Sequence, residues 1–205
     1  MNTAIKVVLL DYGRIVAPED GAPVTQTVYG APPQDKTAAK IFGSLRHDLA
    51  AGKVDEDDIK SLLINEGYII PNDYEERWRH TIENHLRPTS EMINLIETLK
   101  LNHYTVALLS NVWPLSAKII ASNGWYDHFD KIYLSCDMHL AKPDTMIYDT
   151  VLADLAVSPD SVLFIDDKLV NLNYPRELGM QTLHADNPDD AATKITQFLK
   201  LQSPK

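Results

Sequence analysis

Four short apolar runs constrain what this chain can fold into. They are Val7–Leu10, Val106–Leu109, Val162–Ile165 and, less strongly, Lys131–Leu134. Each is continuous rather than alternating, which is typical of parallel strands that are buried on both faces. From residue 90 onward, amphipathic segments separate the runs, so strands and helices alternate. This pattern predicts an α/β fold with an open parallel sheet and crossover helices.

Three of the intervening segments have clear helical signals. Residues Ser90–Lys100 place their apolar side chains on one stripe, as a helix that packs on a sheet requires. The segment Pro114–Ser122 begins with proline and runs to Asn123–Gly124, which is a good stop signal. Asp144–Leu155 is predicted as a further helix.

The stretch between the first two strands has a different character. Residues 16–36 are rich in Pro and Gly and are predicted to form a loop, whereas residues 36–86 carry three helical patterns and no convincing strand. In the middle helix Asp55 is the expected N-cap, with Asp58 three positions on and Gly67 as the stop. The third helix is expected from about Asn72–Asp73 to just before Arg87–Pro88. We therefore expect a small helical insertion that leaves the sheet after its first strand.

Composition excludes several classes of partner. The 29 acidic and 19 basic residues give a formal net charge of −10, and no run of Lys or Arg interrupts this balance. Nucleic acid and anionic membrane are therefore not expected as partners. Cys136 is the only cysteine, which excludes an intramolecular disulfide and disfavours a cysteine-based zinc site. The first apolar run is too short for a signal peptide or a transmembrane helix, so a cytoplasmic location is expected by elimination.

Polar residues follow three of the apolar runs almost without a gap. Asp11 follows the first run, Ser110–Asn111 the second, and Asp166–Asp167 the run that ends at Ile165. Ligands of open α/β sheets bind beyond the carboxyl ends of the strands, where these side chains would meet. Lys142 precedes a predicted helix start and could face the same edge. Taken alone, each residue is more often a turn, cap or surface residue, and only their joint occurrence indicates a site.

Together these segments resemble the haloacid dehalogenase superfamily. The chain reads VVLLDYGRI, VALLSN, AKPDTMIY and VLFIDDKLVN, in the order in which that family carries its Asp, its Ser or Thr, its Lys and its acidic pair. The resemblance implies a Rossmann-like core from residues 1–16 and 88–205, with a helical cap at residues 17–87. The DYGRI segment is similar to an Asp-x-Gly-x-Val/Ile variant of a bacterial branch that includes sugar-phosphate phosphatases, some of which act on glucose 1-phosphate.

The resemblance also implies roles for single residues. Asp11 would be the nucleophile that forms an aspartyl-phosphate, and Lys142 would assist it. The phosphoryl oxygens would be held by Ser110, the Asn111 amide and Lys142. Magnesium would be bound by Asp11, the Gly13 carbonyl and Asp167, with Asp166 acting directly or through water. The implied activity is Mg²⁺-dependent hydrolysis of a small phosphorylated metabolite, with sugar phosphates among the candidates.

One departure from the family pattern leaves alternatives open. Most phosphatases of this superfamily carry a second Asp two residues after the nucleophile as a general acid, and here that position is Gly13. Loss of such help typically costs 10²–10⁴-fold in rate. A weakly active or inactive phosphate-binding protein of the same fold is therefore the main alternative. A 2-haloacid dehalogenase is a further one, but those enzymes need no metal and generally lack the acidic pair. Oligomeric state is not indicated by the sequence.

Overall fold

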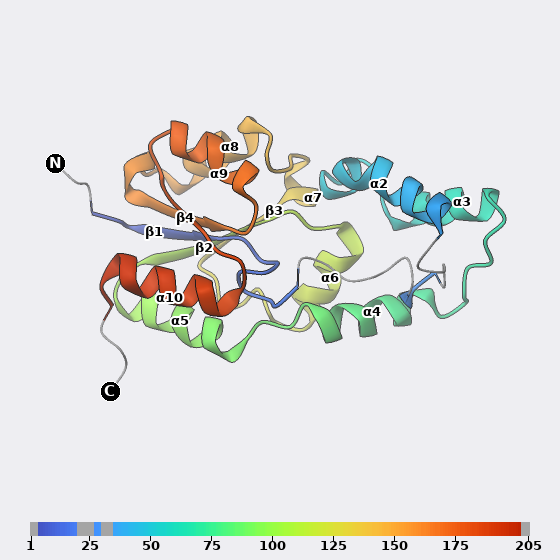
Figure 1. Ribbon diagram of the computed structural model, residues 1–205, viewed down its shortest axis with the longest axis horizontal. Coiled ribbons are helices and arrows are strands. Elements are labelled where there is room, and N and C mark those ends of the chain that lie inside the picture. The colour runs from blue at the N-terminus through green and yellow to red at the C-terminus, as the bar shows by residue number, and fades with distance from the viewer. Residues whose placement is uncertain (1–3, 20–26, 30–34, 202–205) are drawn as a thin grey trace.

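The computed structural model describes residues 4–19, 27–29 and 35–201. Its centre is a sheet of five parallel strands in the order β3-β2-β1-β4-β5 (Figure 1). The predicted α/β architecture with an open parallel sheet is confirmed. The strands are β1 (Val7–Leu10), β2 (Thr105–Ser110), β3 (Lys131–Leu134), β4 (Val162–Asp166) and β5 (Gln181–His184).

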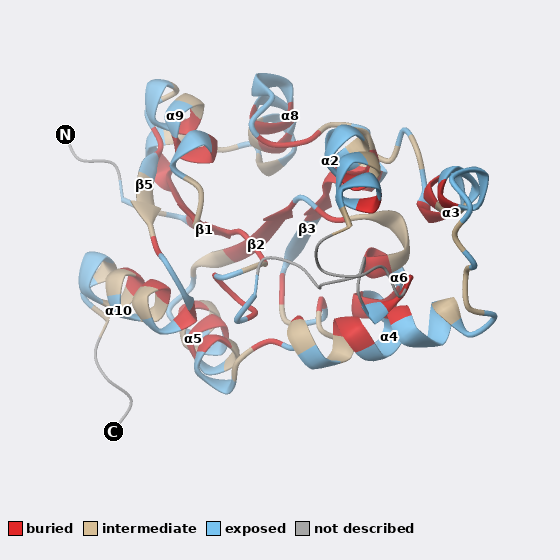
Figure 2. Ribbon diagram, turned by 45° about the vertical axis from the view of Figure 1, so that its right-hand side comes forward, coloured by how far each residue is buried: buried red, intermediate tan, exposed pale blue. Residues whose placement is uncertain are grey.

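The three central strands are buried on both faces, which explains why their sequences are apolar without interruption. Every residue of β1 and β4 is buried, as are the last five of β2 (Figure 2). Successive residues of a strand point to opposite faces. Thus Val8 and Leu10 belong to a core shared with α5 and α10, whereas Val7 and Leu9 belong to one shared with α8 and α9.

Helices cover both faces of the sheet, as crossover connections between parallel strands require. In Figure 1 the pair α8 and α9 lies on one side of the strands and the pair α5 and α10 on the other. The three helices predicted in this region lie within one residue of their predicted bounds. The helices of the sheet layers are α5 (Ser90–Leu101), α6 (Pro114–Ser122), α8 (Thr145–Leu155), α9 (Leu169–Glu177) and α10 (Pro188–Leu199).

The edges of the sheet were harder to predict. The fifth strand, β5, was not predicted, because Gln181–His184 contains little apolar sequence and its first residue is exposed. An edge strand pairs on one side only, so it lacks the continuous apolar signal of a central strand. At the opposite edge, the first two residues of β3 are exposed and the last two buried. The short helices α7 (Ser135–Met138) and η1 (Pro159–Ser161) were also not predicted.

Between β1 and α5 the described residues form three helices and no strand, as predicted. They are α2 (Lys36–Ala50), α3 (Glu56–Asn65) and α4 (Tyr74–His85). Asp55 caps α3 in a capping box: its side chain accepts from the backbone of Asp58, whose own side chain accepts from the backbone N–H of Asp55. Gly67 follows the helix with φ +88°, a conformation that glycine adopts without strain. Most of the loop predicted over residues 16–36 lies outside the described residues.

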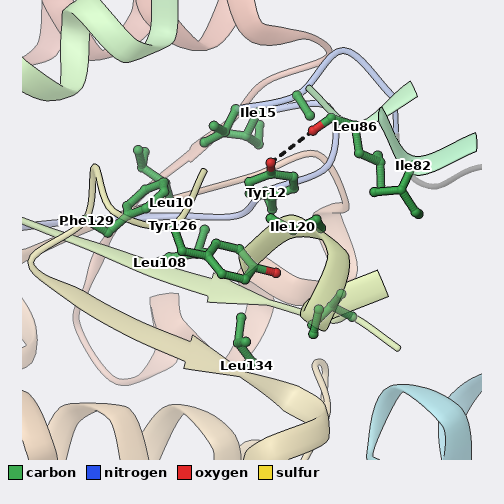
Figure 3. Close-up of a cluster of buried hydrophobic side chains, with 14 of the residues drawn as sticks. Leu10, Tyr12, Ile15, Ile82, Leu86, Leu108, Ile120, Tyr126, Phe129 and Leu134 are labelled. Atoms are coloured by element: carbon green, nitrogen blue, oxygen red, sulfur yellow. Dashed lines mark hydrogen bonds between the residues drawn. The ribbon is translucent and has the colours of Figure 1, made fainter. Parts of the chain in front are cut away.

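The helical insertion packs directly on the sheet domain through α4 and α6. The Trp78 indole N–H donates to Ser116 Oγ over 3.0 Å, and the Trp78 ring meets Trp113 edge-on with centroids 6.0 Å apart. Figure 3 shows a second contact, in which the Tyr12 hydroxyl donates to the carbonyl oxygen of Leu86 over 2.9 Å. Because Tyr12 lies two residues after the end of β1, these contacts fix the insertion close to the carboxyl edge of the sheet. Among the described residues no helix has the length and apolar character needed to cross a membrane.

Candidate active site

Two neighbouring strands deliver three carboxylates to one edge of the sheet. Asp11 follows β1, Asp166 is the last residue of β4, and Asp167 comes next in the chain. One carboxylate oxygen from each of the three lies within 4.8 Å of the others. The three carboxylates, which the sequence predicted to converge, therefore lie together.

Lys142 lies between two of these carboxylates. Its Nζ is 2.9 Å from Asp11 Oδ1 and 2.7 Å from Asp166 Oδ2, and it also donates to the Leu109 carbonyl oxygen over 2.8 Å. An ammonium group has three N–H donors, so all three are engaged. The side chain is only 1% exposed. Burial alone would lower the pKa of Lys142, but Asp11 and Asp166 outweigh this effect and raise it, which keeps the group charged.

Asp11 is buried and held in place. Its Oδ1 accepts from the backbone N–H of Tyr12 over 2.7 Å as well as from Lys142. Burial raises the pKa of Asp11 to about 7, with Asp166 adding to the rise and Lys142 opposing it. Lys142 limits this rise, because a nearby cation favours the ionised form of a carboxyl group.

Asp166 is also fully buried, and its hydrogen bonds point inward. In addition to Lys142, it accepts from the backbone N–H of Lys168 over 2.8 Å and from Asn171 Nδ2 over 2.9 Å, both at Oδ1. These contacts tie the end of β4 to the first turn of α9. The two acids of the pair therefore differ in their surroundings. Asp166 makes its hydrogen bonds inside the protein, whereas the Asp167 side chain, 7% exposed, lies at the rim of the site.

At the rim, Asp167 faces an arginine that was not among the predicted site residues. Arg14 Nε lies 3.5 Å from Asp167 Oδ2, and Arg14 Nη2 donates to the Asp186 carbonyl oxygen over 2.7 Å. Arg14 belongs to the DYGRI segment, but its partners lie far along the chain, so no local sequence signal indicates the contact. Asn171 was likewise missed, because its role depends on the position of Asp166.

Ser110 and Asn111 differ in the hydrogen bonds that their side chains make. Ser110 is buried at the end of β2, and its hydroxyl makes no hydrogen bond with the part of the chain that the structure describes. The Asn111 side chain instead holds the Lys142 segment, because its Nδ2 donates to the Lys142 carbonyl over 2.8 Å and its Oδ1 accepts the Lys142 N–H over 2.9 Å. Gly13, two residues beyond Asp11, makes a short parallel bridge with Ala17.

The donor set fits a hard divalent cation. Magnesium prefers oxygen ligands at about 2.0–2.1 Å, so opposite ligands of one ion lie about 4 Å apart. Carboxylate oxygens of Asp11, Asp166 and Asp167 within 4.8 Å of one another are close enough to share an ion after small adjustments. Asp166 already accepts three hydrogen bonds, which leaves few of its lone pairs for an ion.

Parts of this chain are similar to known proteins. The chain is 35% identical over 104 residues to D-ribitol-5-phosphate phosphatase of Bacteroides thetaiotaomicron, a match that covers 47% of this chain and 50% of that protein. It is 28% identical over 160 residues to bifunctional epoxide hydrolase 2 of Sus scrofa, covering 73% of this chain and 28% of the relative. The matches thus span half or less of these two relatives.

Solved structures share the fold over most of the chain. A haloacid dehalogenase-family enzyme from Bacteroides thetaiotaomicron superposes with a TM-score of 0.78 at 21% identity, covering 94% of this chain and 99% of that one. Its complex with magnesium and inorganic phosphate gives a TM-score of 0.74 at 21% identity, covering 89% and 94%. The family model described as haloacid dehalogenase-like hydrolase matches residues 25–185. With well over half of its residues matched, the chain belongs to the haloacid dehalogenase-like hydrolase family.

Proposed function

We propose that the protein is a Mg²⁺-dependent phosphomonoester hydrolase that acts on a small phosphorylated metabolite through an aspartyl-phosphate. The observation that carries this proposal is the buried Asp11, held by Lys142 and grouped with Asp166 and Asp167 at the carboxyl edge of the sheet. The proposal is supported by a relative named as a phosphatase of D-ribitol 5-phosphate and by a structural neighbour solved with magnesium and inorganic phosphate.

The metal would be held by Asp11, the Gly13 carbonyl and Asp167, with Asp166 reaching it through water. We assign Asp166 the indirect role because its oxygens already accept from Lys142, Lys168 and Asn171. When bound, Mg²⁺ would offset the repulsion between Asp11 and the phosphate and polarise the phosphoryl oxygens.

In the reaction we propose, the Asp11 carboxylate attacks phosphorus, and the bond from phosphorus to the substrate oxygen breaks. The alcohol takes up a proton, and water then cleaves the aspartyl-phosphate to regenerate Asp11 and release phosphate. Lys142 keeps Asp11 in position and its charge faces the site, but its three N–H groups are engaged. A direct hydrogen bond to the phosphoryl group would need one of them to be shared. Ser110, whose hydroxyl makes no hydrogen bond with the described residues, would donate to a phosphoryl oxygen.

The helical insertion, residues 17–87, would act as the cap that closes over the substrate. Its contacts with the sheet domain, Trp78 to Ser116 and Leu86 to Tyr12, fix it beside the catalytic edge. Since Gly13 offers no carboxylate, the proton for the leaving group would come from a cap residue or from water. This favours substrates with a tolerable leaving group, such as a sugar phosphate.

Gly13 is also the observation that favours a second candidate, a protein that binds phosphate without turning it over. Both candidates predict that phosphate binds with Mg²⁺, and they differ in whether phosphate is released from an ester. A 2-haloacid dehalogenase is disfavoured, because those enzymes need no metal and generally lack an acidic pair such as Asp166 and Asp167.

The test is a screen of sugar phosphates, nucleotides and organic acid phosphates for phosphate release, with Mg²⁺ or with EDTA. We expect metal-dependent release that Asp11→Asn abolishes and that Asp48→Asn, a change in an exposed surface pair with Lys53, leaves intact. Activity that persists in EDTA or in Asp11→Asn would refute the hydrolase proposal. Binding of phosphate with Mg²⁺ but no release from any ester would favour the second candidate.

A further inference from the structure

Arg14 is a second cation of the site, separate from Lys142. We propose that it holds Asp167, weakens the binding of Mg²⁺ alone and strengthens the binding of phosphate once Mg²⁺ is present. This inference rests on the proposed function, since it concerns the same metal and phosphate.

The backbone of Arg14 is held in an unusual conformation. Its φ of +61° lies in the left-handed region, which is unfavourable for a residue other than glycine. Its N–H donates to the Glu19 carbonyl oxygen over 3.3 Å, which helps to hold the turn after β1. Strain of this kind persists where the surrounding structure enforces it, and it occurs often at functional sites.

The side chain is fixed at two points from different parts of the chain. Nη2 donates to the Asp186 carbonyl oxygen, 2.7 Å away on the segment between β5 and α10, and Nε faces Asp167 Oδ2 at 3.5 Å beside β4. A carbonyl oxygen carries no net charge, so the hydrogen bond to Asp186 does not neutralise the guanidinium. The planar group is thereby oriented with its charge toward Asp167.

The two cations of the site differ in their exposure to solvent. Lys142 contacts Asp11 and Asp166 but is sealed inside the protein, whereas the Arg14 side chain is 45% exposed. Of these two cations, Arg14 is the one that solvent reaches readily. A divalent ion that binds Asp11 and Asp167 must share Asp167 with the guanidinium, so the two cations compete. A phosphate dianion that follows the ion would instead be attracted, because an arginine offers it paired N–H donors.

Arg14 therefore couples the two ligands. Removing its charge should tighten the binding of Mg²⁺ alone and loosen the binding of phosphate to the Mg²⁺-loaded protein. A residue with a purely structural role would weaken both.

The experiment is isothermal titration of the full chain, first with Mg²⁺ alone and then with inorganic phosphate at saturating Mg²⁺. For Arg14→Gln we expect Mg²⁺ to bind roughly two- to fivefold tighter, the range of an exposed ion pair. Phosphate should bind about tenfold or more weakly, the range of a hydrogen bond to a charged group. Arg14→Lys keeps the charge, so its affinities for Mg²⁺ and for phosphate should lie between those of Arg14→Gln and those of the unmodified protein.

Arg77→Gln is the matched control. Arg77 is 44% exposed and paired with Asp73 on the insertion, so its loss removes the same charge from a similar pair elsewhere. It should leave both affinities unchanged. Unchanged or weaker Mg²⁺ binding in Arg14→Gln, or unchanged phosphate binding, would overturn the inference, while metal-dependent hydrolysis lost in Asp11→Asn would still support the proposed function. If the unmodified chain binds no Mg²⁺, the proposed function itself fails and this inference fails with it.

Discussion

Replacing Lys142 with methionine should show how much the stability of the folded protein depends on this one buried cation. The side chain is 1% exposed and carries contacts of 2.9 Å to Asp11 and 2.7 Å to Asp166. Methionine has similar length but no charge, so both carboxylates would lose their shared partner inside the protein. Breaking a buried ion pair from one side typically costs about 3–5 kcal/mol. We expect a loss of that size in the free energy of unfolding at pH 8.

The loss should depend on pH, and its direction follows from Asp11. Without Lys142, which opposes the effect of burial, the pKa of Asp11 in the folded state rises further above the unfolded value. The folded state then binds protons more strongly than the unfolded state, so the variant is relatively most stable at low pH and loses stability as pH rises. The difference from the unmodified protein should therefore be smaller at pH 5 than at pH 8.

Urea unfolding in the presence of EDTA, followed by tryptophan fluorescence, measures both quantities without interference from bound metal. Lys40→Met, which removes an exposed lysine of α2, is the control and should change stability by less than about 0.5 kcal/mol. Adding Asp166→Asn to Lys142→Met should recover part of the loss, because one of the two unpaired charges is removed. A loss below about 1 kcal/mol at pH 8, or one that is equal at both pH values, would refute the reasoning.

Two further predictions concern the junction between the insertion and the sheet domain. The buried carboxylate of Glu56 accepts from the backbone N–H of Leu115 over 2.9 Å, and burial raises its pKa, so the contribution of Glu56 to stability should fall as pH rises above about 4.5. Glu56→Gln should therefore gain stability relative to the unmodified protein between pH 4 and pH 8 in urea unfolding, and a constant difference would contradict this. At Gly52, where φ is +60°, a Cβ would clash with the Cys136 carbonyl oxygen, whereas Gly67 at φ +88° has nothing within 4 Å. Gly67→Ala should lose roughly 1–2 kcal/mol from backbone strain alone, and Gly52→Ala should lose clearly more by thermal unfolding. Equal losses would show that the contact with Cys136 can relax.

Local signals account for the parts of this protein that the sequence determined by itself. The central strands could be located because both of their faces are covered, so Val7–Leu10 and Val162–Ile165 contain no polar residue. Helix boundaries depend on residues next to them, as with the capping box at Asp55 and the proline that opens α6. The grouping of Asp11 with Asp166 and Asp167 also followed from the sequence, because the carboxyl ends of neighbouring parallel strands meet at one edge.

Only the tertiary structure decided how that edge is arranged. Asp166 and Asp167 are neighbours in sequence, yet one is bound into the interior through Lys142 and Asn171 while the other faces Arg14 at the rim. The edge strand β5 was likewise decided by pairing with β4 and not by its own composition. In each case the deciding contact joins residues that are distant in the chain. Local propensity does not predict such a contact, because the energy of the contact comes from burial and charge compensation that exist only after folding.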